Sequence, residues 1–245
     1  MKALEITDIQ KTYRSGKREI RAVDGVSLIV KEGEIFGLLG MNGAGKSTTI
    51  KICTGVTAPD GGDVSVFGHA VASVEARRLM NVSPQETAVA PLLSVKENLV
   101  LIARLYGADK DEAASAALST AERLGLTDRL SDRAGKLSGG LMRRLSVGMA
   151  VVTNPKLIFL DEPTLGLDIV ARRELWRYIR EIRKSAAIIL TTHYLEEAEA
   201  LCDRIAIMAK GKIVAIGSPS ELIEKSGKDN FEDAFLALSG EENYE

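Results

Sequence analysis

The sequence predicts a single α/β domain with a parallel or mixed sheet, an antiparallel β-rich N-terminal part and a helical insert. In the first third, short segments rich in β-branched residues are bounded by glycine-rich turns, as is typical of strands. The middle has helical propensity and capping signals. From residue 157 strand-like and helix-like segments alternate, which indicates parallel strands joined by crossover helices. We place the insert at about 88–150, between core segments at about 1–87 and 155–225, with a helical tail at about 226–245.

Four segments of the N-terminal part are predicted strands: ALEITDI, VDGVSLIV, EIFGLLG and GDVSVFG, at 3–9, 23–30, 34–40 and 62–68. The third is almost entirely apolar, which predicts a strand that is buried on both faces. A helical stretch, STTIKICTG, follows at 47–55. The residues between them therefore form a turn that connects a buried strand to a helix.

Capping residues mark the helices of the insert and of the C-terminal part. Ser94 and Glu97 form a predicted capping box, and the alanine-rich segment 109–125 has strong helix propensity. A second predicted capping box, at 218–221, has Pro219 at its first helical position.

The last third has a regular order of elements. Strands are predicted at 156–160, 186–192 and 204–211, with helices at about 168–184 and from about 195. The segment 231–240 carries one apolar stripe, Phe231, Ala234, Phe235 and Leu238, which predicts an amphipathic helix packed on its own domain.

The composition is that of an ordinary globular protein, with 45% hydrophobic residues, 27% charged residues and a formal net charge of −2. Nucleic-acid binders usually carry a basic excess or patch, so we expect no nucleic-acid partner. Cys53 and Cys202 lack neighbours at metal-binding spacing and are expected to be reduced, partly buried thiols. The N-terminus has no signal-peptide pattern, and no apolar run approaches the roughly 18 residues of a membrane helix. We expect a soluble, cytoplasmic chain whose membrane role would depend on another chain.

The segment GMNGAGKS matches the phosphate-binding pattern GxxxxGK[ST] and lies between a predicted strand and a predicted helix. Its glycines, Gly40, Gly43 and Gly45, let backbone N–H groups point towards phosphate oxygens. Lys46 is expected to reach the β- and γ-phosphates, and the hydroxyl of Ser47 is expected to bind Mg²⁺. The sequence therefore predicts a P-loop NTPase core.

Two adjacent carboxylates, Asp161 and Glu162, follow the apolar segment KLIFL. An Asp at this place holds Mg²⁺ in P-loop NTPases, which leaves the second carboxylate free to polarise the attacking water. The pair predicts hydrolysis of a Mg-nucleotide. A small-molecule kinase or a GTPase remains possible, although the sequence has no Asn-Lys-x-Asp motif for guanine.

A second glycine-containing motif, LSGG at 137–140, adds a helix N-cap, Ser138, and two glycines that let backbone amides approach an anion. With this motif the chain resembles, over nearly its whole length, the ATP-binding subunit of ATP-binding cassette (ABC) transporters. The run LSGGLMRRL is similar to the exporter branch in which the ATPase and the permease are separate chains. The helical insert would then be the subdomain that carries the signature motif.

The resemblance implies a role for each matched residue. Tyr13 would stack on adenine, Gln85 would approach Mg²⁺ and the attacking water, and His193 would contact the γ-phosphate. Glu162 would be the general base, with Lys46, Gln85 and His193 also catalytic, and Asp161 would bind Mg²⁺ with Ser47 and Gln85. The implied ATP contacts are Tyr13, Gly40, Asn42, Gly43, Ala44, Gly45, Lys46, Ser47, Thr48, Ser138, Gly139, Gly140 and Asp168.

Two positions depart from the family pattern: Leu141 replaces the usual glutamine of the signature, and Met41 stands where proline is frequent. We interpret Leu141 as a feature of the branch, because the expected ligand groups lie elsewhere.

The resemblance also implies partners. Two ATPase chains, identical or different, would pair head to tail, so that the P-loop of one and the LSGG motif of the other enclose one ATP. An integral membrane permease would hold the pair at the inner face of the cell membrane. Its docking surface is predicted on the segment after Gln85, through LLSVKENLVLIARLYG, although this segment could equally pack within its own domain.

Three classes of function compete. The leading hypothesis is the ATPase subunit of a membrane exporter. A soluble ABC-type ATPase acting on nucleic acid or ribosomes usually has two cassettes or a coiled-coil insert, and this sequence has neither. A non-hydrolytic module is disfavoured by the intact Lys46, Asp161, Glu162 and His193.

Overall fold

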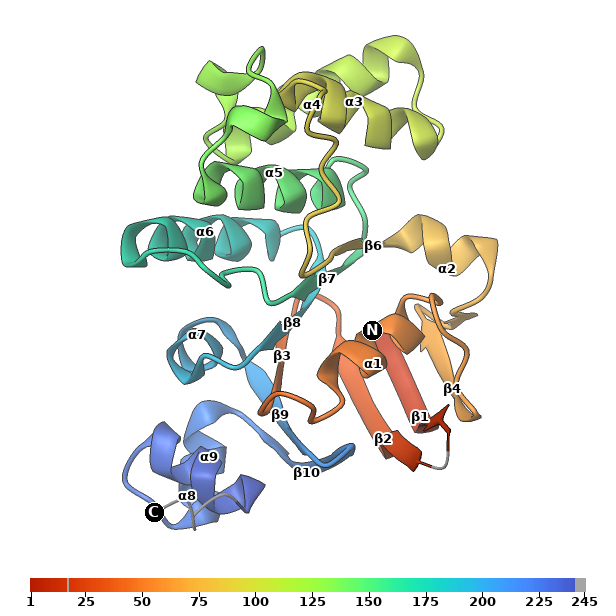
Figure 1. Cartoon of the computed structure of the whole chain (residues 1–245), viewed down its shortest axis with the longest axis vertical. Coiled ribbons are helices and arrows are strands. Elements are labelled where there is room, and N and C mark those ends of the chain that lie inside the picture. The colour runs from red at the N-terminus through yellow and green to blue at the C-terminus, as the bar shows by residue number, and fades with distance from the viewer. Residues whose placement is uncertain (17, 241–245) are drawn as a thin grey trace.

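The computed structural model describes residues 1–16 and 18–240, and within them the strands form two sheets (Figure 1). The first sheet is antiparallel, with the order β2-β1-β4-β5. Its strands are β1 (Lys2–Ser15), β2 (Arg18–Lys31), β4 (Gly61–Val66) and β5 (His69–Ala70). The predicted antiparallel N-terminal part is therefore present, and the two-residue β5 is an addition that the sequence analysis lacked.

The second sheet is central and mixed, with the order β10-β9-β3-β8-β7-β6. Its pairs are parallel except for the hairpin of β9 with β10. The strands are β3 (Ile35–Leu39), β6 (Met80–Ser83), β7 (Leu157–Asp161), β8 (Ala187–Thr192), β9 (Arg204–Ala209) and β10 (Lys212–Gly217). The fold class is as predicted, and β6 and β10 were not predicted.

Helix α1 (Lys46–Cys53) lies between the two sheets (Figure 1). Its buried Ile50 and Ile52 belong to a core that also includes the inner face of the antiparallel sheet. On β3, Phe36 and Leu38 face this core, whereas Ile35 and Leu39 face the helices on the opposite side. Because β3 is buried on both faces, its carboxyl end and the loop that follows it are rigidly supported.

The other face of the central sheet is covered by helices α5 (Gly139–Val151), α6 (Ile169–Ile182) and α7 (Leu195–Leu201), with α2 (Val74–Leu79) beside β6. Helices α3 (Val95–Leu105) and α4 (Lys110–Arg123) pack on α5, on its side away from the sheet (Figure 1). Short 3₁₀ turns span Thr127–Arg129 and Ala134–Lys136. The predicted capping box of Ser94 and Glu97 is formed at the start of α3.

The C-terminal helices α8 (Pro219–Ser226) and α9 (Phe231–Ser239) pack on each other and on β9 and β10. Phe231, Ala234 and Phe235 are buried, as the apolar stripe predicted. The last part of the predicted tail, 241–245, lies outside the described residues.

Cys53 and Cys202 are free thiols, but both are fully rather than partly buried, at 1% and 7% exposed. Burial raises the pKa of both thiols. Among the described helices, none has the length and apolar character of a membrane span.

Candidate functional site

The loop between β3 and α1 is a backbone cradle whose path requires glycine. Gly43 and Gly45 have φ angles of +82° and +107°, which L side chains rarely adopt. A Cβ atom at Gly45 would lie 2.3 Å from the carbonyl oxygen of Ala22, and one at Gly40 would lie 2.5 Å from that of Met208. The cradle is thus held tightly between β2 and β9 and opens at the N-terminus of α1, where free N–H groups and the helix dipole favour an anion.

Lys46 begins α1 and places its ammonium group under the cradle. Its Nζ donates to the carbonyl oxygens of Gly40 at 2.6 Å and Met41 at 3.3 Å, and lies 3.8 Å from Oε1 of Glu162. Burial lowers the pKa of Lys46, whereas attraction to the carboxylates of Glu162 and Asp161 raises it. The side chain is therefore a buried cation at the wall of the cradle, positioned to bind phosphate oxygens.

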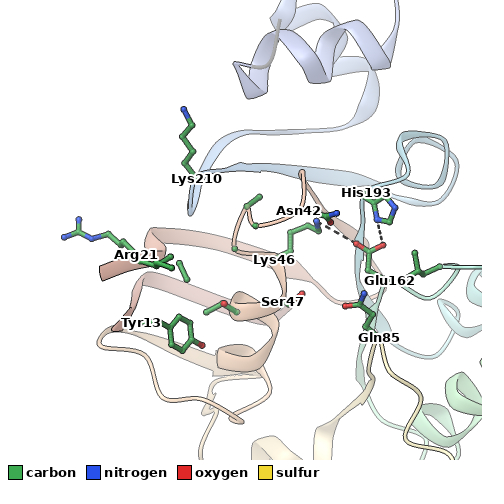
Figure 2. A pocket seen from close by; sticks show the side chains of 16 residues that line it. Tyr13, Arg21, Asn42, Lys46, Ser47, Gln85, Glu162, His193 and Lys210 are labelled. Atoms are coloured by element: carbon green, nitrogen blue, oxygen red, sulfur yellow. Dashed lines mark hydrogen bonds and ion pairs between the residues drawn. The ribbon is translucent and has the colours of Figure 1, made fainter. Parts of the chain in front are cut away.

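Glu162 and His193 meet at the carboxyl ends of two neighbouring strands, β7 and β8. His193 Nδ1 lies 2.8 Å from Oε2 of Glu162, whose side chain is 7% exposed. Glu162 has φ of +51°, an unusual backbone conformation for a non-glycine residue that costs on the order of 1–3 kcal/mol. The strand end turns sharply here and directs the carboxylate towards Lys46 and His193 (Figure 2).

Thr191, which the sequence analysis did not single out, holds both acidic residues in place. Its hydroxyl donates to Oδ1 of Asp161 at 2.5 Å and accepts from the backbone N–H of Glu162 at 3.0 Å. Thr191 is fully buried, and its β8 position pairs with Asp161 of β7. The signal in the sequence was present, since the threonine precedes His193 in the TTH segment, but the contact depends on the strand register.

Lys46, Glu162 and His193 line a cavity of about 650 Å³ (Figure 2). The predicted residues that line it are Tyr13, Asn42, Gly43, Ala44, Gly45, Lys46, Ser47, Thr48, Gln85, Glu162 and His193. Gln85 and Ser47 point into the space in front of Glu162, and Tyr13 lies further along the cavity, on β1 (Figure 2). The cavity therefore extends from an aromatic ring, past a phosphate cradle, to a carboxylate.

Five lining residues were not predicted: Ile20, Arg21, Ala22, Leu165 and Lys210. Lys210 lies in the β9–β10 turn, where Gly211 N donates to Ala44 O at 3.0 Å and the Gly211 carbonyl accepts from Asp24 N at 2.9 Å. The turn is thereby joined to the cradle. A basic residue before a glycine at a strand end was visible in the sequence, but its neighbours were not.

Other predicted residues do not line the cavity of their own chain. Gly40 lies at the start of the cradle, where its carbonyl oxygen accepts from Lys46, and Asp161 accepts from Thr191 beside Glu162. Ser138 is the N-cap of α5, where its Oγ accepts from Leu141 N at 3.4 Å, with Gly139 and Gly140 in the first turn. Asp168 is exposed and is the N-cap of α6.

Leu141 is partly buried and packs against the helical core. Because its side chain takes a packing role, the substitution leaves the Ser138 cap and its backbone amides intact.

A buried parallel strand, a glycine cradle at a helix N-terminus, a buried lysine and a carboxylate with its histidine define a nucleotide hydrolase of the P-loop class. The ABC transporter family matches residues 23–165. The chain belongs to this family, whose ATPase domain binds and hydrolyses ATP.

Individual relatives agree with this assignment. The chain is 39% identical over 229 residues to the linearmycin resistance ATP-binding protein LnrL of Bacillus subtilis (strain 168). The aligned region covers 92% of this chain and 72% of LnrL. It is 42% identical over 228 residues to the doxorubicin resistance ATP-binding protein DrrA of Mycobacterium tuberculosis (strain CDC 1551 / Oshkosh), covering 92% and 68%.

The fold is shared with a solved ATP-binding cassette, MJ0796, described as a dimer in a post-hydrolysis state with bound ADP and Pi. The TM-score is 0.80 at 24% identity, and the similarity covers 88% of this chain and 98% of the other.

Proposed function

We propose that this chain is the ATP-hydrolysing subunit of a membrane exporter and drives a separate permease. The observation that carries the proposal is that the two phosphate-binding motifs lie at different places in the chain's structure. The cradle around Lys46 lines the cavity with Glu162 and His193, whereas Ser138 caps another helix outside it. A site that holds nucleotide but lacks its second motif suits a pair of chains that complete each other's sites.

In this proposal Glu162 is the general base. Its carboxylate lies in the cavity and is held by His193, which donates through Nδ1 when that nitrogen carries the proton. Lys46 binds phosphate oxygens, and Tyr13 provides a ring surface for the adenine base. His193 both orients Glu162 and faces the position of the terminal phosphate.

The donor atoms also suit Mg²⁺, which prefers oxygen ligands and usually binds through few protein groups together with substrate phosphates. Ser47 offers a hydroxyl, Gln85 an amide oxygen and Asp161 a carboxylate, and the first two line the same cavity. A bound Mg²⁺ would neutralise the charge that develops on the phosphates. We therefore propose that the ATPase activity depends on Mg²⁺.

The proposed second ATPase chain would supply Ser138, Gly139 and Gly140 to the first chain's nucleotide, with Asp168 at the boundary between chains. Ser138 and Asp168 are both exposed helix N-caps, and Gly140 lies against α6 close to Ala171. The two N-termini are thus side by side on one face. The dimeric MJ0796 cassette supports this pairing.

The proposed permease contact lies on α3 and the loop before it. Leu92, Leu101, Leu105 and Tyr106 are large apolar residues with 41–79% of their surfaces exposed. Val95 and Leu99 of the same helix are fully buried, so α3 has apolar residues on its inner and its outer side. An outer apolar surface that follows the Gln85 loop suits a partner that senses nucleotide through this loop.

Both relatives are named for resistance to a small molecule, which supports export as the direction of transport. The chain would then be peripheral to the cytoplasmic face of the membrane, attached by its permease. The division into a nucleotide-binding core and a helical insert at about 88–150 is part of the same proposal.

The proposal is tested by affinity purification of the full chain from detergent-solubilised membranes of its own organism, followed by ATPase assays with and without Mg²⁺. We expect a multi-span membrane protein to co-purify and to raise the ATPase rate. Recovery of only ribosomal or DNA-associated proteins would preserve the ATPase assignment and contradict the transport proposal.

A further inference from the structure

Arg143 is a buried arginine that joins helix α5 to the loop containing Gln85. Arg143 is only 7% exposed. Its two terminal nitrogens donate to the carbonyl oxygens of Pro84 at 3.1 Å and Gln85 at 3.0 Å. The planar guanidinium thus binds two consecutive backbone carbonyls as a fork. The Gln85 backbone is held from behind while its side chain lines the nucleotide cavity.

A second contact fixes the same two elements. Ser146 lies three residues after Arg143, on the same side of α5, and its hydroxyl is 2.9 Å from that of Ser83 at the end of β6. Ser83, Pro84 and Gln85 are consecutive, so α5 contacts the chain both at the end of β6 and in the loop that follows it. A displacement of α5 along its axis would therefore pull on the backbone at Gln85.

The charge of Arg143 is also linked to the nucleotide site. Burial lowers the pKa of its guanidinium, whereas the carboxylates of Asp161 and Glu162 raise it by attraction. The guanidinium remains cationic near neutral pH because the usual pKa of arginine is far higher. Arg143 therefore interacts electrostatically with Asp161 and Glu162 while its side chain binds the backbone of the Gln85 loop.

We propose that Arg143 is a positioning residue that couples the placement of Gln85 in this chain's cavity to the placement of Ser138, at the start of α5, in the neighbouring chain's site. The inference rests on the proposed function, since it needs Ser138 to serve a second chain. It gives each chain a direct mechanical connection between the two ATP sites to which it contributes, along the segment of α5 from Ser138 to Arg143.

Arg144 provides a matched control. It is the next residue of α5 and is also a largely buried arginine, but it pairs with Glu174 of α6 and lies over the ring of Tyr178. Loss of Arg144 removes a buried cation and its packing without touching the Gln85 loop. A merely structural role of Arg143 would give the two variants the same behaviour.

The test compares Arg143→Met, Arg143→Lys and Arg144→Met with the wild-type full chain. Steady-state ATPase gives kcat and KM, a fluorescent ATP analogue gives the dissociation constant, and amide hydrogen exchange is followed at 85–88. For Arg143→Met we expect kcat to fall about 10- to 100-fold, as misplacement of a reacting group does, with the dissociation constant changed less than about threefold. Exchange at 85–88 should be faster. Arg143→Lys should restore part of both properties, and Arg144→Met should change neither.

Equal effects of Arg143→Met and Arg144→Met on kcat and on exchange at 85–88 would overturn the inference. If Arg143→Met does not fold, Arg143→Lys decides, because one donor in place of a fork should still leave the loop less protected than in the wild type. A wild-type chain that neither co-purifies with a permease nor shows a turnover rate per chain that rises with chain concentration would instead contradict the proposed function. If the turnover rate per chain of the wild type rises with chain concentration but Arg143→Met has wild-type kcat and exchange, the proposed function stands and only the coupling role of Arg143 is contradicted.

Discussion

His193 Nδ1 lies 2.8 Å from Oε2 of Glu162, which joins the carboxyl ends of β7 and β8 by one side-chain contact. The contact places a nitrogen that can donate a hydrogen bond against a carboxylate that is almost completely buried. Lys46 approaches the other oxygen of the same carboxylate at 3.8 Å. Glu162 is therefore oriented by two groups on opposite sides and cannot rotate freely away from the cavity.

Replacement of Glu162 by Gln should lower ATP turnover by roughly 10²–10⁴-fold, because the amide keeps the shape of the side chain but is not a base. Binding of ATP should persist, since Lys46 and the cradle are unchanged. Turnover and equilibrium binding are measured on the same preparation. The control is Glu196→Gln, the same chemical change at an exposed residue paired with Arg172. Wild-type turnover in Glu162→Gln would contradict the assignment of the base.

Thr191→Val should weaken both the fold and the activity, whereas Thr191→Ser should preserve them. Valine has the same shape but removes the hydroxyl that Asp161 accepts from and Glu162 N donates to. A buried donor left without its partner costs about 1–3 kcal/mol, and here the Glu162 N–H loses its side-chain acceptor while the partly buried Asp161 carboxylate loses its donor. Urea unfolding and kcat are compared for the three proteins. A valine variant as stable and active as the serine variant would show that the strand pairing alone positions these carboxylates.

The sequence predicted the fold class and most strands and helices because the relevant signals are local. Apolar runs, capping boxes and glycine turns each determine a few neighbouring residues, and all of them agree here. The contacts made by Thr191 and Arg143 could not be predicted, because they depend on which strands pair and on which helix face meets the Gln85 loop. The short β5 and β6 were missed for a different reason, because two and four residues carry little periodicity.

The candidate site also combines features that local sequence signals predict with contacts that depend on the tertiary fold. The sequence located the cradle at 40–46 through its spacing, and the fold brings Tyr13 and Gln85 to the same cavity from distant positions. Lys210 was overlooked because its place beside the cradle follows from the hydrogen bond of Gly211 to Ala44. The functional roles of these residues remain predictions for the experiments described.

Gly45→Ala should abolish nucleotide binding, whereas Gly43→Ala should weaken it only moderately. Both glycines have positive φ, which costs a non-glycine residue about 1–3 kcal/mol. The added Cβ at Gly45 would also meet the Ala22 carbonyl oxygen at 2.3 Å, whereas one at Gly43 would have no heavy atom of the described chain within 4 Å apart from those of Gly43 and its two chain neighbours. Thermal unfolding and titration with an ATP analogue measure the difference. Equal loss in both variants would mean that backbone strain, and not the close approach of β2, dictates glycine at Gly45.

Glu197→Gln should make the stability of the protein less dependent on pH. Glu197 is fully buried on α7, where Oε1 accepts from Trp176 Nε1 at 3.0 Å. Burial raises the pKa of its carboxyl above the usual value of 4.5 and the charge of Glu162 adds to the shift, whereas the hydrogen bond from Trp176 opposes it.

The sign follows from proton linkage. The folded protein holds this proton more tightly than the unfolded chain, so the contribution of Glu197 is fully present below the unfolded pKa near 4.5 and is lost as pH rises through the raised folded pKa. Glutamine does not ionise. The unfolding free energy of Glu197→Gln should therefore rise relative to that of the wild type as pH increases from the unfolded pKa to the folded pKa, and the difference between the two proteins should be constant at higher pH. Urea unfolding between pH 4 and pH 9 measures the difference, with exposed Glu199→Gln on the same helix as the control. Parallel pH profiles for the wild type and Glu197→Gln would show that folding does not raise the pKa of this carboxyl.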